Sequence, residues 1–405
     1  MTFEKGFWQM AYDKGGGTGG DTGTGVDLFD PAGSGSLYES LGEARAACPV
    51  VHNDRHGGHW MVLGYEAAKE VLTRPDRFSS EGGITLDESP VSGSLIETDP
   101  PRHRELRRPL DRYFGAQHLS RYEPFVVETT DRLIGGWIDD GRCDIVAAFA
   151  GPLAASVLAR VVLGLPDATD AAAILEAAEA VESGAAGVRN EAALRDLILD
   201  LITSRRSSDE RTDDVLSAIV FGTTAEGPLT EAQVYNTIRL FLGAGQDTTK
   251  AAIANAVLRL TTVPHLEPRL RERSLTRGDV DELLRLDSPV VGLCRVAREA
   301  VTLEGQPIAK GDKLMVFYGA ANRDANRFPD PEQLDLDRAD NAHLAFGSGV
   351  HRCIGASLAR LEIRIAIERL LAQVRDLRRA STAPVVFRPG VIRYPESLVV
   401  TFRPS

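Results

Sequence analysis

Apolar residues recur at helical spacing through most of the chain. The longest such pattern lies between Thr230 and Leu260, and similar patterns predict helices over 65–73, 279–286 and 356–371. The residues that share one face of the longest pattern are Val234, Ile238, Phe241, Gly245, Thr248 and Ala252. Between residues 103 and 260 the helical pattern is interrupted at Gly141, Pro166, Gly184 and Gly227-Pro228. The pattern therefore predicts a mainly helical protein.

Segments with strand character are short and lie outside these helices. Two of them fall within 49–63 on either side of a His-Gly-Gly turn, and others cover 300–303 and 313–317. Residues 79–98 and 320–345 lack periodicity and predict irregular structure. The expected fold class is mainly α with minor β. His52, His56 and His59 could suggest a metal site, but polar residues of a hairpin turn are the favoured interpretation.

The amino-terminal segment has a different composition from the rest. Residues 13–36 are rich in Gly, Ser, Thr and Asp, which is typical of a flexible linker. Gly15, Gly17 and Gly20 match G-x-G-x-x-G, but no predicted strand precedes them and no predicted helix follows. The dinucleotide-binding interpretation therefore lacks its structural context. We predict a flexible Gly-rich leader over 1–36 and a single folded domain over 37–405.

Composition and charge argue against several functional classes of protein. Of 405 residues, 43% are hydrophobic and 26% are charged, which fits a globular protein. A net charge of −12 speaks against a general nucleic-acid binder. The four cysteines are widely spaced, which favours a reducing cytoplasm over a disulfide framework. The longest apolar run, 145–159, is too short and too interrupted to cross a membrane, so we expect a cytoplasmic protein without membrane association.

One cysteine lies in a context that favours metal chemistry. Residues 346–355, FGSGVHRCIG, place Cys353 in a glycine-rich turn immediately before a predicted helix. A helix amino terminus and its free N–H groups favour a thiolate over a thiol. The glycines tolerate positive φ and let backbone approach a large flat group. An isolated cysteine would more simply be inert and buried, but the complete spacing F-G-x-G-x-H-x-C-x-G favours a metal ligand.

This segment resembles the haem-binding signature of the cytochrome P450 superfamily. Residues 282–285, ELLR, are similar to the family's E-x-x-R motif, and residues 244–249, AGQDTT, resemble its oxygen-activation motif. All three occur in the family's order. The similarity runs from about residue 37 to the carboxyl terminus and implies one cytochrome P450 catalytic domain over 37–405. In that fold the haem lies between a long distal helix and the proximal helix that follows residues 346–355, which we call the Cys loop.

The resemblance implies a set of haem-binding residues. Cys353 would be the axial ligand of haem b, and Glu282 and Arg285, with Arg338 as third member, would hold the haem pocket without taking part in chemistry. The haem propionates would be bound by His103, Arg107, Arg295 and His351, with Arg298 as the alternative to Arg295. The haem pocket would also be formed by Ala244, Gly245, Phe346, Gly347 and Gly355.

Oxygen and substrate would be handled on the distal side. Asp247 and Thr248 form an acid–alcohol pair that would deliver protons, and Gly245 would leave space for dioxygen; a solvent-facing Asp-Thr pair is the alternative. Residues 167–191 would form part of a mobile lid. The candidates for substrate contact, all equally consistent with ordinary core, are Ile84, Leu86, Leu95, Leu240, Val291, Leu293 and Ile392.

The implied activity is that of a haem-thiolate monooxygenase. It would hydroxylate or epoxidise a small apolar organic or natural-product substrate with O2 and two electrons. The chain has no room for a flavin or ferredoxin module, so a separate ferredoxin and ferredoxin reductase would carry electrons from NAD(P)H to a monomeric enzyme. Arginines within 102–112, with Arg352, Arg360 and Arg364, would form the docking face.

Three other activities compete with this interpretation. Carbon–carbon coupling, desaturation or nitration would use the same motifs and cannot be separated by sequence. A peroxide-driven peroxygenase typically lacks the acid–alcohol pair that is present here. A non-catalytic haem sensor would have no need for a distal proton relay.

Overall fold

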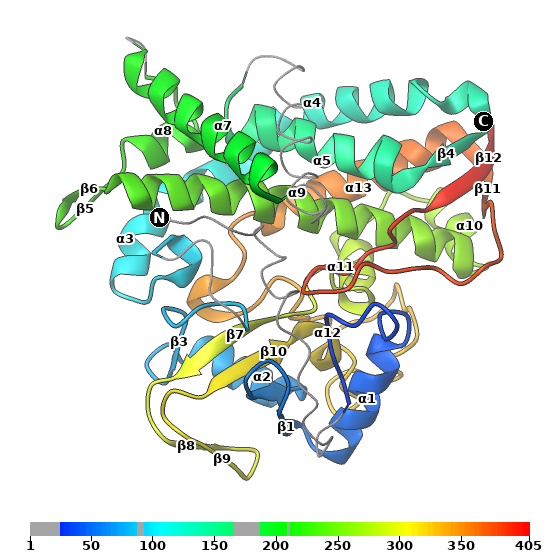
Figure 1. Ribbon diagram of the computed structural model, residues 1–405. Helices are drawn as coiled ribbons and strands as arrows, with labels where there is room; N and C mark the ends of the chain where they lie inside the picture. The colour runs from blue at the N-terminus through cyan, green and yellow to red at the C-terminus, as the bar shows by residue number, and fades with distance from the viewer. Residues whose placement is uncertain (1–24, 87–92, 166–186, 209–210) are drawn as a thin grey trace.

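The computed structural model describes residues 25–86, 93–165, 187–208 and 211–405, and this part of the chain forms two regions (Figure 1). Long helices, with α9 (Glu231–Thr262) running through their middle, make up one region. A sheet that includes β7 (Gly292–Ala297) and β10 (Lys313–Phe317) makes up the other. The helices that accompany this sheet are α1 (Leu37–Ala47), α2 (Tyr65–Thr73) and α12 (Tyr318–Ala321). A buried apolar cluster extends from Val26 to Phe402 and joins segments distant in sequence. No helix in the described ranges is long and apolar enough to cross a membrane.

The helical content agrees with the predicted class. Each of the strongly periodic segments is a helix, with ends within a few residues of the expected ones. The α-helices of the described residues are α1 (Leu37–Ala47), α2 (Tyr65–Thr73), α3 (Arg102–Asp111), α4 (Ala116–Gly135), α5 (Gly151–Val157), α7 (Gly187–Ser207), α8 (Val215–Val220), α9 (Glu231–Thr262), α10 (Leu266–Arg271), α11 (Arg277–Leu286), α12 (Tyr318–Ala321) and α13 (Ala356–Gln373). Two π-helical segments, η5 (Val146–Ala150) and η6 (Leu158–Val162), flank α5.

The largest sheet has five strands in the order β1-β2-β10-β7-β3. Strand β10 runs parallel to β2 and antiparallel to β7. The strands of this sheet are β1 (Val50–Asn53), β2 (His59–Val62), β3 (Phe78–Ser79), β7 (Gly292–Ala297) and β10 (Lys313–Phe317). Small hairpins are formed by β5 (Thr223–Thr224) with β6 (Gly227–Pro228) and by β8 (Val301–Leu303) with β9 (Gln306–Ile308). The predicted strands around residues 56–58, 300–303 and 313–317 are therefore present.

A three-stranded sheet near the carboxyl terminus was not predicted. It has the order β11-β12-β4, with β4 (Arg142–Asp144), β11 (Val374–Arg379) and β12 (Val399–Pro404). The sequence of β11, VRDLRR, is rich in charge, and its pairing with β12 shifts register between Arg375 and Arg378. Such a shift breaks the alternation by which a strand is found in sequence.

The long helix α9 begins at a capping box. The Thr230 side chain accepts a bond from the backbone N–H of Gln233, whose side chain accepts one from the N–H of Thr230. Most of α9 is buried, and it packs against α5 and α13. Because Gly, Asp and Thr in its middle are poor helix formers, this tertiary packing rather than intrinsic propensity holds the helix there.

Part of the expected leader is folded. Residues 1–24 lie outside the described residues, but Val26, Leu28 and Phe29 are buried in the main core. The backbone of this segment bonds to two other regions, because Asn53 donates to the Val26 carbonyl at 2.9 Å and the Gly390 N–H donates to that of Leu28 at 2.6 Å. The leader boundary at residue 36 was therefore wrong for residues 25–36, since their apolar side chains add to the core. The rest of the domain division stays a prediction.

Two histidines near this segment, His56 and His59, are packed within the fold. His56 pairs with Asp27 at 2.9 Å, which helps to lower the pKa of Asp27 to about 2 against the opposing effect of burial. Burial lowers the pKa of His59 to about 4. Within the described ranges no group of three or more His, Cys, Asp or Glu side chains is arranged to hold a metal ion.

Candidate functional site

A large cavity lies between α9, α13 and the Cys loop. Its lining includes the predicted Cys353, Ala244, Gly245 and Thr248 together with the four predicted propionate partners. Its empty space, including the mouth, is about 1510 Å³. The cavity therefore brings Cys353, the middle of α9 and the predicted propionate partners to one site.

The Cys loop owes its path to two glycines with positive φ. Gly347 has φ +65° and Gly349 has φ +69°, a region that disfavours side chains. A Cβ at Gly349 would collide with the backbone of Leu72 and Thr73 at the end of α2. Gly349 thus packs the loop against α2 and is absent from the cavity lining, whereas Gly347 and Gly355 belong to it. The loop closes through a 2.9 Å bond from the Cys353 N–H to the Phe346 carbonyl.

Of the four cysteines, Cys353 alone belongs to the described cavity lining. Its side chain opens into the cavity while protein surrounds it on the other sides, and this burial raises the pKa of the thiol. The N–H of Gly355 and the charge of Arg107 act in the opposite direction. The other three thiols are packed elsewhere. Cys48 donates to the Val50 carbonyl at 2.9 Å, Cys143 is buried in β4 with a pKa raised to about 12, and Cys294 contacts Met315 within the sheet.

Four nitrogen-bearing side chains meet at one end of the cavity. His103 and Arg107 lie one turn apart on α3, Arg295 comes from β7, and His351 precedes Cys353. The rings of His103 and His351 are 4.3 Å apart between centroids, and the Nε2 atom of each is buried without a hydrogen-bond partner. Burial, with Arg107 adding to it, lowers the pKa of His103 to about 4. Burial, followed by the charge of Arg295, lowers the pKa of His351 to about 2.

These residues fit a cofactor that carries carboxylates at one edge. The Nε2 atoms of both imidazoles are buried without a partner, and two guanidinium groups lie beside them. Arg107 is only partly engaged, by Asp111 and the Val350 carbonyl, and Arg295 by the Cys294 carbonyl. Buried polar groups normally have partners, so an anionic group at this end would complete the set. The Cys353 sulfur faces the same cavity and offers one axial bond. Arg298, the alternative to Arg295, instead pairs with Asp99 and does not belong to the lining.

Helix α9 forms the opposite wall. The Thr248 hydroxyl donates to the Ala244 carbonyl at 2.7 Å, and both residues line the cavity. A Cβ at Gly245 would lie 2.9 Å from a methyl carbon of Leu158 in η6, so this glycine lets α9 pack closely against η6 as well as lining the cavity. Asp247 is buried on the neighbouring flank of α9, outside the lining, and pairs with Lys250 at 3.4 Å.

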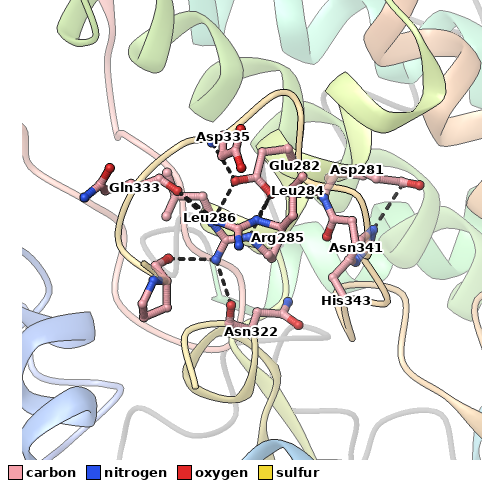
Figure 2. Close-up of polar contacts among 12 residues, drawn as sticks. Asp281, Glu282, Leu284, Arg285, Leu286, Asn322, Gln333, Asp335, Asn341 and His343 are labelled. Atoms are coloured by element: carbon pink, nitrogen blue, oxygen red, sulfur yellow. Dashed lines mark hydrogen bonds and ion pairs between the residues drawn. The ribbon is translucent and has the colours of Figure 1, made fainter. Parts of the chain in front are cut away.

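The E-x-x-R motif forms a fully buried ion pair on α11, a helix whose Leu284 lines the cavity (Figure 2). Arg285 donates to both oxygens of Glu282 at 2.8 Å, and it also binds the carbonyls of Asn322, Pro331 and Gln333. Glu282 receives further bonds from Asn341 at 3.0 Å and from the Asp335 N–H at 2.9 Å. Arg338 donates to the same carboxylate at 3.1 Å, so the structure brings together all three members of the predicted triad. The pair therefore fixes the irregular segment 322–341 that leads into the Cys loop.

Comparison with known proteins agrees with this site. The family profile described as Cytochrome P450 matches residues 185–378. Cytochrome P450 monooxygenase PikC of Streptomyces venezuelae is 35% identical over 383 residues, which cover 90% of this chain and 91% of that protein. The chain belongs to the cytochrome P450 family.

Other relatives and solved structures give the same result. The mycinamicin IV hydroxylase/epoxidase of Micromonospora griseorubida is 36% identical, covering 79% of this chain and 83% of that protein. The substrate-free structure of Mycobacterium marinum cytochrome P450 CYP150A6 matches with a TM-score of 0.81 at 30% identity, covering 94% and 99% of the two chains. This cytochrome P450 is a monooxygenase that binds haem through a cysteine thiolate and receives electrons from NAD(P)H through partner proteins.

The predicted substrate contacts of this cytochrome P450 divide into two groups. Leu95, Leu240 and Leu293 belong to the cavity lining. The other four are buried in the core outside the lining, and they are Ile84, Leu86, Val291 and Ile392. Ile392 instead forms an isolated bridge with Val290, whose side chain does reach the cavity. Sequence cannot make this distinction because both groups are simply apolar. The expected lid, 167–191, lies outside the described residues except for the first turns of α7.

Two polar residues of the site were missed by sequence reasoning. Glu362 on α13 lines the cavity, is fully buried, and has an oxygen without a hydrogen-bond partner; burial raises its pKa well above the usual value. Lys250 is buried beside Asp247. No local signal marked Lys250, because the four residues before it, 246–249, are polar as well.

Proposed function

We propose that Cys353 is the haem ligand of this monooxygenase, that Thr248 and Asp247 deliver protons, and that the substrate is a small apolar natural product or related molecule. One observation carries the assignment: the cavity whose lining includes Cys353 is also lined by His103 and His351, whose Nε2 atoms are buried without a hydrogen-bond partner. The thiolate and the donors would hold haem b by its iron and its propionates. The haem supplies activation of O2 once two electrons arrive.

The residues of α9 support proton delivery. The Thr248 Oγ1 atom donates its proton to the Ala244 carbonyl, so its lone pairs are directed away from that carbonyl and can accept a proton. Asp247 lies one residue earlier and brings an ionisable carboxyl group to the same turn of the helix. The Thr248 Oγ1 atom would therefore be the last protein group to hold the proton before it reaches the reacting oxygen. Asp247 would then return a proton to Thr248.

The lining supports an apolar substrate. The wall contributed by α5, η6 and the first half of α9 consists of apolar side chains: Ala154, Val157, Leu158, Val162, Leu240 and Phe241. Such a wall removes apolar surface from water at about 25 cal/mol per Å² and offers no partner to a charged substrate. The names of relatives point the same way, since they include a mycinamicin hydroxylase/epoxidase and a steroid C26-monooxygenase.

The electron donor would be an acidic ferredoxin served by a ferredoxin reductase. Arg104, Arg108 and Arg352 are exposed near the Cys loop and support docking there. Arg360 does not, because it is paired with Asp281 at 2.5 Å and packs over the Phe346 ring. A monomeric enzyme in the cytoplasm stays part of this proposal, and the absence of disulfides among the four cysteines fits a reducing compartment.

Substitutions on α9 test the proposed proton relay from Asp247 through Thr248. A probe substrate is first chosen from a panel of apolar natural products and steroids by the shift it induces in the haem spectrum. Thr248→Ala should keep haem content, probe binding and O2 consumption while diverting oxygen to hydrogen peroxide. Asp247→Asn should slow turnover, because general-acid assistance typically contributes about 10²–10⁴-fold. The matched control is Thr237→Ala, a buried threonine of the same helix outside the cavity lining. Unchanged product per NAD(P)H in Thr248→Ala would contradict the proposal.

A further inference from the structure

Lys250 is a buried cation in the middle of α9, the helix that forms the wall of the cavity opposite Cys353. Its side chain is 4% exposed and lies one turn beyond Asp247, whose side chain is 6% exposed. The residues that follow it on α9 are apolar, including Ala251, Ala252 and Ile253, whereas the four residues before it are polar. A lysine is almost never buried unless it is paired, because desolvation of an ammonium group costs several kcal/mol. The position of Lys250 therefore needs a reason beyond helix formation.

The geometry links Lys250 to two groups. Its Nζ atom is 3.4 Å from the Asp247 carboxylate and 4.8 Å from the centre of the Tyr394 ring. Tyr394 belongs to the carboxyl-terminal loop, which is fastened to α9 because Asn255 donates to the Arg393 carbonyl at 3.0 Å. The other cation over this ring is Arg388, at 5.8 Å. The ammonium is thus held between the aromatic face and the carboxylate.

The pair lies beside the cavity and not inside it. Ala244, Thr248 and Ala252 line the cavity from one face of α9, while Asp247 and Lys250 lie outside that lining and Lys250 contacts the Tyr394 ring. Exposed pairs three residues apart contribute only about 0.2–0.5 kcal/mol to a helix, which would not offset the burial of both charges. A structural pair could have been placed on the surface of the helix at no such cost. Its placement next to Thr248 favours a role in the reaction.

We propose that Lys250 is a positioning residue that holds the Asp247 carboxylate in the place and charge state from which it recharges Thr248. This inference rests on the proposed proton relay. Lys250 lies outside the cavity lining, so its proposed effect on the reaction passes through Asp247. A cation with the same reach should substitute for it, whereas an apolar side chain of similar length should not.

A double-mutant cycle with the haem-loaded enzyme tests this role. The variants are Lys250→Met, Lys250→Arg, Asp247→Asn and the double variant Lys250→Met/Asp247→Asn, all assayed with the probe substrate chosen above. Turnover, product per O2 and the solvent deuterium isotope effect are measured, and haem content and the probe-induced spectral shift report on folding. Lys250→Met should slow turnover roughly tenfold and raise the isotope effect, while Lys250→Arg should keep most of the rate. The double variant should be no slower than the slower single variant, because contacting residues of one unit are not additive.

The possible failures are distinguishable. If Asp247→Asn is slow and Lys250→Met has normal turnover, the role of Lys250 is wrong and the relay stands. If the two single effects multiply in the double variant, Lys250 acts independently of Asp247 and the inference is again wrong. If Asp247→Asn changes neither turnover nor the isotope effect, both the relay and the inference fail. Should Lys250→Met lose haem, Lys250→Gln, which keeps a polar end, is subjected to the same cycle.

Discussion

The buried Glu282 carboxylate allows the sharpest stability prediction. It accepts five hydrogen bonds, two from Arg285 and one each from Arg338, Asn341 and the Asp335 N–H. Glu282→Gln preserves the shape of the side chain but replaces one oxygen by an NH2 group and removes the charge. The substitution therefore changes the electrostatics of the network with little change in packing.

The size of the effect follows from the donors left without an acceptor. If the amide oxygen takes the place of Oε2, three bonds survive, and the NH2 group then faces two donors, Arg285 Nη2 and the Asp335 N–H. Each unsatisfied buried donor costs about 1–3 kcal/mol, and breaking a buried ion pair costs about 3–5 kcal/mol. We expect a loss of about 3–5 kcal/mol. Total stabilities of proteins are about 5–15 kcal/mol, so the loss would be a large fraction of the whole.

Urea unfolding of the haem-loaded protein, followed by circular dichroism and by haem absorbance, measures this loss. The matched control is Asp337→Asn in the same segment, whose partner is Arg269 at 2.5 Å with both side chains exposed. Exposed pairs contribute about 0–1 kcal/mol, so the control should unfold nearly like the wild type. A Glu282→Gln protein that unfolds at the same urea concentration as this control would refute the reasoning.

Three further predictions concern the ligand, the buried acid and the docking face. Cys353→His should abolish the red-shifted absorption band of the reduced, carbon monoxide-treated protein, and alanine at each of the other three cysteines should preserve it. Glu362→Met should stabilise the protein by about 1–3 kcal/mol at pH 8, the cost of an unsatisfied buried group. Because folding raises the pKa of Glu362 above its usual 4.5, the wild type should lose stability as pH rises above that value, and the variant should show a flatter profile in denaturant titrations. Electron transfer from an acidic ferredoxin should slow steeply with salt, and Arg104→Glu with Arg108→Glu should remove that dependence in stopped-flow measurements.

Sequence could predict those parts of the site whose geometry depends only on residues close together along the chain. Glu282 and Arg285 lie three apart on α11 and meet without help from the rest of the fold. Gly347 occupies a backbone conformation that few other residues accept. Helices such as α2 and α9 also follow from local periodicity. In each case residues within one short segment determine both the chemistry and the geometry.

Long-range packing accounts for what sequence missed. Val26, Leu28 and Phe29 follow a glycine-rich segment, and their burial depends on the hairpin at residue 53 and the loop at residue 390. Leu95 and Leu86 have the same chemistry, yet only the first reaches the cavity. Lys250 resembles any helical lysine until Tyr394 is seen to pack over it from a segment more than a hundred residues away. These features depend on contacts that no local pattern contains.

Arg360 shows how this difference bears on function. From the sequence alone, Arg360 was predicted to add one more positive charge to a basic docking surface. In the structure its guanidinium bonds to Asp281, which also accepts from His343, and stacks on the Phe346 ring at the start of the Cys loop. Arg364 is likewise paired, with Glu123 and Glu368. An arginine that is already neutralised steers a partner weakly. In the proposed docking, the attraction for a ferredoxin therefore comes from the exposed cations of α3 and from Arg352, while Arg360 supports the loop that carries Cys353, the proposed haem ligand.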